Sequence, residues 1–237
     1  MSHEIRTPMN SIIGMADMLA EAELTQDQCR YLQILRNSGQ VLLNVVNDIL
    51  DFSKLEAGNF TLDDISFDIR HLASRVAELV EDMARRKKLG FFYSFEAEPY
   101  QWIRGDPKRI EQIILNIIGN AVKFTESGQI NFTVSVKVNA PSNILCLRFT
   151  DTGIGIAADK IPIIFNRFGQ SDTSITRKFG GTGLGLAIVK QLVEAINGSV
   201  SVSSCVGRGS EFIVEIPFLV GVKPSVTEIA AAPIEEN

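Results

Sequence analysis

The chain has 237 residues, of which 45% are hydrophobic and 22% charged, so it can form one or two folded domains and is not disordered as a whole. Its formal net charge of -5 argues against a general nucleic-acid binder, which needs a basic face. The three cysteines, Cys29, Cys146 and Cys205, show neither a disulfide framework nor a metal-binding spacing, which indicates a reducing compartment. Because no apolar run approaches the ~18 residues of a membrane span and no signal peptide begins the chain, we expect a soluble, cytoplasmic fragment without membrane contact.

Two helical patterns occupy residues 1–58. Apolar residues recur every three or four positions from residue 1 to about 22 and from about 25 to 55. Thr25 indicates the cap of the second helix, and Gly58-Asn59 ends it. Because two such helices cannot bury their apolar stripes alone, we expect an N-terminally truncated hairpin that pairs with a second copy into a four-helix bundle. Packing of the hairpin on the rest of the chain is the alternative.

Short strands and helices alternate after residue 58. We expect strands at residues 60–62, 91–95, 102–105, 130–138, 144–151, 199–204 and 211–217, and helices at 69–86, 107–124 and 185–196. This order predicts an α/β sandwich over residues 59–220, with a mixed, mostly antiparallel sheet covered by helices on one face. Residues 221–237 are rich in Ala, Pro and Glu, which is typical of a linker or flexible tail.

The first candidate for chemistry is the segment around His3. On a helix His3 and Thr7 share a face, Glu4 lies beside it, and Pro8 bends or loosens the backbone there. A neutral imidazole is a nucleophile near neutral pH, and a carboxylate can orient it or take its proton. Taken alone, however, the segment favours an ordinary surface histidine on a polar helix.

Two further patterns indicate a ligand. Asn116 and Asn120 lie one turn apart on an otherwise apolar helix, where their amide oxygens could reach Mg²⁺ or form a buried hydrogen-bonded pair. Asp151, Gly153 and Gly155 follow a predicted strand. Glycines there let the backbone approach a flat ligand, and the carboxylate could accept from an exocyclic amine such as that of adenine.

A second glycine-rich segment, residues 180–185, opens a predicted helix, and the N–H groups at a helix N-terminus suit phosphates. Its surroundings fit neither a dinucleotide fingerprint nor a Walker loop. The long polar stretch 157–178 between the two glycine segments predicts a mobile lid over the ligand. Within it, Phe165 fits core packing and ligand contact equally, whereas Phe168 fits core packing less well.

Taken in order, these segments resemble the sequence boxes of sensor histidine kinases of two-component systems. The correspondence covers residues 2–8 (H-box), 116–125 (N-box), 151–156 (G1 box), 165–168 (F-box) and 181–186 (G2 box). The likeness runs from residue 2 to about residue 218 and is closest to the kinase core of hybrid sensor kinases, although this sequence contains no receiver domain. It implies a GHKL-type, or Bergerat, ATP-binding domain at 59–220.

The resemblance also implies residue roles. His3 is the expected phosphoacceptor, Glu4 its orienting or basic neighbour, and Thr7 the residue that helps to place water for dephosphorylation of the partner regulator. Asn116 and Asn120 match the Mg²⁺-ATP asparagines, and Asn120 is the better candidate for the metal.

The same resemblance assigns the nucleotide contacts. Lys123 and Phe124 match residues near phosphate and adenine, Asp151 matches the adenine-reading aspartate, and Gly153 and Gly155 make room for the base. The lid and phosphate loop supply the remaining cofactor-binding residues: Phe168, Gly181, Thr182, Gly183, Leu184 and Gly185.

We therefore expect a homodimeric histidine protein kinase core that binds ATP and Mg²⁺, phosphorylates His3 and passes the phosphoryl group to an aspartate of a receiver domain. A small rotation of the hairpin helices is a hypothesis for how its activity is switched. The alternatives are a GHKL-type ATPase and a degenerate nucleotide-binding dimeric scaffold. Asn116 favours the kinase, because such ATPases typically carry a water-activating carboxylate at that place.

Overall fold

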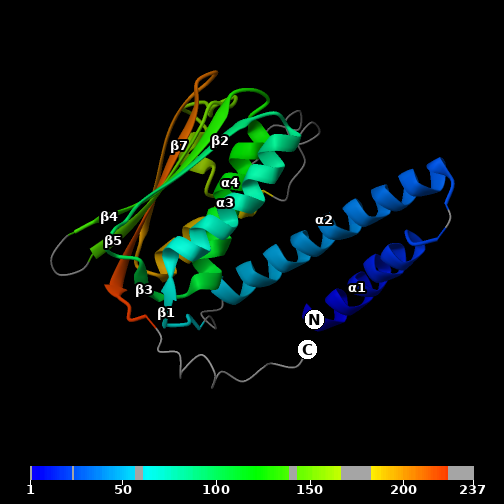
Figure 1. Cartoon of the computed structure of the whole chain (residues 1–237), viewed down its shortest axis with the longest axis horizontal. Helices are drawn as coiled ribbons and strands as arrows, with labels where there is room; N and C mark the ends of the chain where they lie inside the picture. The colour runs from blue at the N-terminus through cyan, green and yellow to red at the C-terminus, as the bar shows by residue number, and fades with distance from the viewer. Residues whose placement is uncertain (1, 23, 57–60, 139–142, 167–182, 224–237) are drawn as a thin grey trace. The chain divides into compact units, whose positions relative to one another are not determined.

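The computed structural model describes residues 2–22, 24–56, 61–138, 143–166 and 183–223. Within the first two of these ranges, the description excludes the side chains of residues 2–6, 41, 44, 48, 51, 52 and 54–56. The chain divides into two compact units, Met1–Phe60 and Thr61–Asn237. Figure 1 shows the first as a helical hairpin and the second as a sheet covered by helices.

The hairpin consists of α1 (Ser2–Leu19) and α2 (Gln26–Glu56). Its two helices meet where side chains are small, because Ala16 and Gly39 are both buried. A Cβ at Gly39 would lie 3.0 Å from Cγ1 of Ile13, which is tighter than most packed contacts. Gly39 therefore lets α1 approach the backbone of α2, and the two predicted helices are confirmed.

Local polar contacts define the ends of the hairpin. The side chain of Thr25 accepts from the backbone N–H of Gln28, and the Gln28 side chain accepts from the N–H of Thr25, at 3.3 and 2.9 Å. This reciprocal capping box confirms the predicted start of α2. An ion pair of 2.8 Å between Arg36 and Asp17 joins the two helices. α1 remains helical through Pro8.

The second unit is built on a seven-stranded sheet in the order β1-β3-β7-β5-β4-β2, with β6 also paired to β7. Its strands are β1 (Ile65–Asp68), β2 (Gly90–Glu96), β3 (Trp102–Gly105), β4 (Gln129–Lys137), β5 (Asn143–Asp151), β6 (Ser199–Cys205) and β7 (Gly209–Val220). β2 pairs with β4 in parallel, and the other described pairings are antiparallel. The predicted mixed, mostly antiparallel sheet is confirmed.

Three helices cover one face of this sheet: α3 (Ile69–Arg86), α4 (Pro107–Phe124) and α6 (Gly185–Ala195). α4 contacts both α3 and α6, and Figure 1 shows α3 and α4 together in front of the strands. Successive strand side chains alternate between the two faces. Accordingly, Phe132 of β4 and Phe149 of β5 are buried and stack with ring centroids 4.9 Å apart.

The opposite face of the sheet carries polar pairs. Arg148 of β5 donates to Glu211 of β7 at 2.6 Å, and the amide of Asn131 donates to Thr150 at 2.9 Å. Because a strand alternates with a period of two, the register that buries the aromatic core exposes these residues. Among the described residues, the stacked aromatic pair thus lies on the helix-covered face and these polar pairs lie on the other.

The strand expected at residues 60–62 is a wrong prediction. Thr61 and Leu62 lie outside any strand, Phe60 is not among the described residues, and the strand begins at Ile65. The physical reason is cross-strand pairing, since β1 exists through its antiparallel register with β3, in which Ile65 lies opposite Gly105. Local apolar content does not reveal that partner.

Most other element boundaries agree with expectation. α4 begins at Pro107, and α6 ends shortly before Asn197, which adopts a φ of +55° as helix-terminating residues often do. In the part of the chain that the structure describes, no helix combines the length and the apolar character needed to cross a membrane.

Candidate functional site

The helix α4 carries the two asparagines predicted to bind a metal ion. Asn116 and Asn120 are both partly exposed on a helix whose other face is buried in the core. The Oδ1 atom of Asn116 lies 3.5 Å from where a Cβ of Gly185 would stand. The amide oxygen therefore faces the first turn of α6, and the missing side chain at Gly185 leaves space beside it. An amide oxygen next to an open backbone turn suits a hard cation.

The C-terminus of α4 is tied to two other segments. Lys87 Nζ donates to the carbonyl oxygens of Val122 and Lys123 at 2.8 and 3.2 Å. The backbone N–H of Ile154 donates to the carbonyl oxygen of Phe124 at 3.2 Å. These contacts bring the end of the asparagine helix against the loop that follows β5.

Two side chains at this helix end, those of Lys123 and Phe124, form a small cationic corner. Lys123 Nζ lies 4.8 Å from the centre of the Phe124 ring, a distance typical of a cation–π contact. Burial lowers the pKa of the Lys123 ammonium below its ordinary value of 10.5. A partly desolvated ammonium is well suited to interact with an anionic ligand such as a phosphate.

Asp151 stands at the end of β5, where β4 and β7 flank it opposite Ile130 and Ser210. The N–H of Gly153 donates to its Oδ1 atom at 2.8 Å. Burial raises the pKa of the Asp151 carboxyl above its ordinary value of 3.8, and backbone hydrogen bonds from Gly153 and Ser210 oppose that rise. Since a carboxylate can accept about four hydrogen bonds, Asp151 keeps capacity for a ligand N–H group.

The glycines after Asp151, which were predicted to make room for a base, have a packing role in the structure. A Cβ at Gly153 would stand 2.6 Å from the carbonyl oxygen of Phe124. At Gly155, which has a φ of +69°, it would stand 2.1 Å from the carbonyl oxygen of Cys205. The loop therefore lies directly against the ends of α4 and β6, and a side chain at either position would displace it.

The residues that fix the Asp151 loop by hydrogen bonds and close packing were not predicted from the sequence. Ser204 Oγ accepts from the N–H of Ile156 at 2.8 Å, and Thr152 Oγ1 accepts from the N–H of Gln129 at 2.9 Å. A Cβ at Gly209 would meet the carbonyl oxygen of Asp151 at 1.9 Å. The signal in the sequence is the glycine-rich stretch 207–209, which lies between the strands expected at 199–204 and 211–217.

The predicted phosphate loop is described in part. Phe168, Gly181 and Thr182 lie outside the described residues, as does most of the expected lid. Gly183 has a φ of +70°, and the buried Leu184 precedes Gly185, the first residue of α6. The described part is thus a turn that opens a helix, as expected for a phosphate site.

The remaining predicted residues lie elsewhere. His3 and Glu4 belong to α1, and their side chains are not among those described; Thr7 is exposed on the same helix. Phe165 lies edge-on to Phe212 of β7 with ring centroids 6.5 Å apart, which supports the core-packing interpretation for this phenylalanine.

Two family matches cover the two units. Residues 1–58 match the family described as His Kinase A (phospho-acceptor) domain. Residues 105–220 match the family described as histidine kinase-, DNA gyrase B-, and HSP90-like ATPase. The second match includes α4, the Asp151 loop and the start of α6, which form the site described above.

Curated relatives share most of the chain. It is 42% identical over 220 residues to hybrid signal transduction histidine kinase L of Dictyostelium discoideum, covering 92% of this chain and 13% of that protein. It is 39% identical over 219 residues to the autoinducer 2 sensor kinase/phosphatase LuxQ of Vibrio harveyi, covering 92% of this chain and 26% of that protein. The chain thus spans about a quarter or less of these two relatives.

Solved structures resemble it as well. Full-length ShkA in complex with AMPPNP matches with a TM-score of 0.77 and 38% identity, over 94% of this chain and 46% of that one. The histidine kinase AdeS of Acinetobacter baumannii matches with a TM-score of 0.62 at 23% identity, over 91% of this chain and 97% of that one. At that lower identity the likeness concerns the fold alone.

Proposed function

Because this chain belongs to the sensor histidine kinases, with a phospho-acceptor domain followed by an ATPase domain, we propose that it binds Mg-ATP and transfers the γ-phosphate to His3. The phosphoryl group then passes to an aspartate of a receiver domain. The observation that carries the nucleotide half of this proposal is the convergence of α4, the Asp151 loop and the first turn of α6. Ile154 bonds to Phe124, and the Asn116 amide oxygen lies next to Gly185.

Each part of the site has a role in this proposal. Asp151 accepts from the exocyclic amine of adenine, and the amide oxygens of Asn120 and Asn116 hold the magnesium ion that accompanies ATP. The N-terminus of α6 faces the phosphates with Gly183 and Gly185, where backbone N–H groups favour negative charge. The similarity to ShkA, which was solved with AMPPNP, supports nucleotide binding.

Transfer to histidine requires little covalent chemistry from the protein. An imidazole nitrogen of His3 attacks the γ-phosphorus, a P–N bond forms, the bond to the bridging oxygen breaks, and ADP leaves. Glu4 orients the imidazole or takes its proton, and Thr7 is assigned to the reverse, dephosphorylating reaction of the regulator. The catalytic work of the ATPase domain is positioning and charge neutralisation.

The hairpin supports a homodimer. Large apolar side chains remain exposed along both helices: Ile12, Met15, Met18, Leu19, Tyr31, Ile34, Leu35, Leu42 and Ile49. Leu35, Leu42 and Ile49 recur every seven residues on α2, the repeat by which helices pack along a seam. A second copy of the hairpin would bury this seam in a four-helix bundle.

Light scattering tests the homodimer. A glutamate in place of Leu42 would be buried in the seam, so Leu42→Glu should give monomers at concentrations where the wild type is dimeric. Gln33→Glu adds the same charge on the opposite side of α2 and should leave the dimer intact. Equal masses for the two variants would contradict this interface.

Incubation with γ-labelled ATP tests the proposed reaction. Acid-labile, alkali-stable label on the protein indicates phosphohistidine, whereas release of free phosphate without label indicates an ATPase. His3→Gln should abolish labelling and leave nucleotide binding intact, whereas Asp151→Asn should weaken both. Labelling of His3→Gln at the wild-type level would exclude His3 as the acceptor, and the absence of both label and phosphate would leave a nucleotide-binding scaffold.

Further parts of the proposal concern the whole protein. The similarity to hybrid kinases supports a phosphorelay through a receiver domain, either in the same chain or in a partner. The reaction is proposed to occur in the cytoplasm because it consumes ATP. Residues 1–58 are the proposed dimerisation and phosphotransfer hairpin, residues 59–220 the catalytic domain, and 221–237 a linker or tail.

A further inference from the structure

The last turn of α4 depends on donors from outside the helix. A helix leaves its final carbonyls without an intrahelical N–H partner. In α4 the N–H of Thr125 still bonds to Ala121, and the next three carbonyls belong to Val122, Lys123 and Phe124. Lys87 donates to the first two and Ile154 to the third. The helix end that carries the cationic corner is therefore completed by one side chain and one loop.

Lys87 reaches this position because α3 and α4 run parallel and in step. Arg75 of α3 pairs with Glu111 of α4 at 2.8 Å, across 36 residues. Lys87 meets the carbonyl of Lys123 across the same 36 residues, three turns further along. A parallel pair of helices places the last residue of one beside the last carbonyls of the other. The ammonium also lies at the negative end of the α4 dipole.

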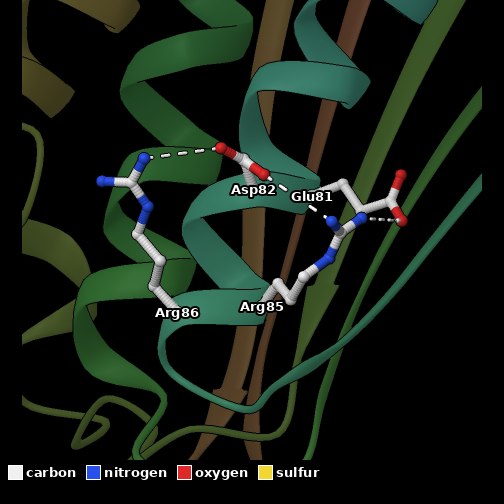
Figure 2. Close-up of polar contacts among 4 residues, drawn as sticks. All are labelled: Glu81, Asp82, Arg85 and Arg86. Carbon is white, nitrogen blue, oxygen red and sulfur yellow. Dashed lines mark hydrogen bonds and ion pairs between the residues drawn. The ribbon is translucent and has the colours of Figure 1, made fainter.

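The end of α3 is itself held in helical form. Glu81 pairs with Arg85 and Asp82 with Arg86, each one turn apart, as Figure 2 shows. At the C-terminus of α3 the backbone N–H of Lys87 donates to the carbonyl of Ala84, and that of Lys88 donates to the carbonyl of Arg85. The (i, i+4) pairs favour helix up to the residue before Lys87. The lysine therefore projects from an ordered helix end.

We infer that Lys87 is a positioning residue for the nucleotide: its ammonium clamps the last turn of α4 and thereby holds Lys123, Phe124 and the Asp151 loop in the binding arrangement. This inference rests on the proposed function. Lys87 acts on the site through two backbone carbonyls. The next carbonyl along the chain, that of Phe124, accepts from the N–H of Ile154. Lys87 and the Asp151 loop therefore bind the same turn of α4.

Loss of the clamp should reduce the population of molecules that are ready to bind. Without Lys87, two carbonyls at the helix end lose a charged donor, and the last turn of α4 opens more often. Apparent affinity falls in proportion to the fraction of molecules in the competent state. Bound nucleotide restores the turn through its own contacts, so the maximal rate at saturating ATP is spared.

Three substitutions in the full chain separate this role from general stabilisation. Lys87→Met removes the ammonium and keeps the length of the side chain, Lys87→Arg restores a charged donor, and Lys88→Met removes the same charge from the adjacent exposed lysine. Binding of Mg-AMPPNP is measured by calorimetry, and KM and kcat for ATP are measured from histidine labelling. Amide exchange is followed at Ile154 and Thr125 in the absence of nucleotide.

We expect Lys87→Met to weaken Mg-AMPPNP binding and raise KM about five- to tenfold, the effect of losing roughly one hydrogen bond at an exposed side chain, with kcat within about twofold. Exchange at Ile154 and Thr125 should quicken. Lys87→Arg should restore affinity, and Lys88→Met should resemble the wild type.

A lower melting temperature of Lys87→Met with unchanged affinity and KM would overturn the inference and leave Lys87 as a stabilising cap alone. So would equal effects of Lys87→Met and Lys88→Met. If the wild-type chain itself bound no Mg-AMPPNP, the proposed function would fail, and this inference with it.

Discussion

The buried carboxylate of Asp106 accepts a hydrogen bond from the backbone N–H of Asp63, 43 residues earlier in the chain, at 3.1 Å. Its other oxygen accepts from the N–H of Arg109 and caps α4. One side chain thus joins the segment that precedes β1 to the start of the helix that carries the asparagines. Removal of this buried carboxylate takes the acceptor away from both backbone N–H groups.

Asp106→Ala should therefore destabilise the sheet unit by about 2–3 kcal/mol, the sum of a lost helix cap and a lost hydrogen bond between a carboxylate and the N–H of Asp63. Urea unfolding followed by the fluorescence of Trp102, the single tryptophan of the chain, reports on this unit because Trp102 lies in β3. Asp82→Ala on the exposed face of α3 is the matched control and should change stability by less than about 0.5 kcal/mol. Equal losses in the two variants would refute a bridging role for Asp106.

The turn between β6 and β7 offers a matched pair of glycines. Gly207 and Gly209 both have positive φ angles, +76° and +96°. A Cβ at Gly207 meets nothing within 4 Å, whereas at Gly209 it would stand 1.9 Å from the carbonyl oxygen of Asp151. Gly207→Ala should cost about 1–2 kcal/mol through backbone strain alone.

Gly209→Ala should cost more than about 3 kcal/mol, because the backbone of Asp151 must move as well. It should also weaken Mg-AMPPNP binding, whereas Gly207→Ala should leave binding intact in the folded protein. Urea unfolding and calorimetry measure the two effects. Similar results for both variants would show that the backbone of Asp151 can move away from the start of β7 at little cost.

The Asp151 carboxyl should oppose stability at neutral pH. Because burial raises its pKa in the folded chain, the folded state binds this proton more tightly than the unfolded state. Its contribution to stability is complete below the ordinary value of 3.8 and is lost as pH rises through the raised pKa. The free energy of unfolding of the wild type, minus that of Asp151→Asn, should therefore fall from acid to neutral pH.

At neutral pH, Asp151→Asn should thus be at least as stable as the wild type while binding less nucleotide. Asparagine keeps an oxygen for the Gly153 N–H and loses the charge. Such opposition of stability and binding is common at functional sites. If the difference in unfolding free energy between the wild type and Asp151→Asn did not change with pH, it would contradict a buried Asp151 carboxyl with a raised pKa.

The Lys123 ammonium should make nucleotide affinity sensitive to alkaline pH. Its pKa is lowered by burial, so it loses its proton below 10.5 in the free protein. Nearby phosphates favour the charged form. The affinity for Mg-AMPPNP should therefore fall as pH rises through this lowered pKa, with uptake of a proton on binding.

Lys123→Arg provides the control, because a guanidinium stays charged throughout this range. Its affinity should stay level from about pH 8 upward, where the phosphates no longer titrate. Calorimetry in buffers of different ionisation enthalpy measures the proton uptake directly. The same alkaline decline in both proteins would exclude Lys123 as its source.

Part of the fold was predictable because it is specified by neighbours in the chain. The capping pair Thr25 and Gln28, the Asp106-Pro107 start of α4 and the Asn197 end of α6 all act within one helical turn. Alternating apolar residues likewise predicted β4 and β5. The strand expected at residues 60–62 failed because β1 depends on pairing with β3, about 40 residues away.

The candidate site divides in the same way. Residue types alone, namely two asparagines one turn apart and an aspartate before spaced glycines, pointed to the nucleotide chemistry. From the sequence, the glycines at residues 153 and 155 were explained only by the space that a flat ligand needs. The structure adds the carbonyl oxygens of Phe124 and Cys205, which come from segments distant in the chain.

By itself, the amino-acid order determined the helices and most of the strands and predicted the chemical type of the candidate site, since periodicity, capping and side-chain chemistry are local properties. Only the tertiary structure decided that Lys87 completes α4, that Asp106 holds Asp63, and that Gly209 stands behind Asp151. Those relationships depend on the parallel packing of α3 against α4, with its fixed offset along the chain, and on the register of the strands. Both are set by packing of the common core, which no short segment of sequence contains.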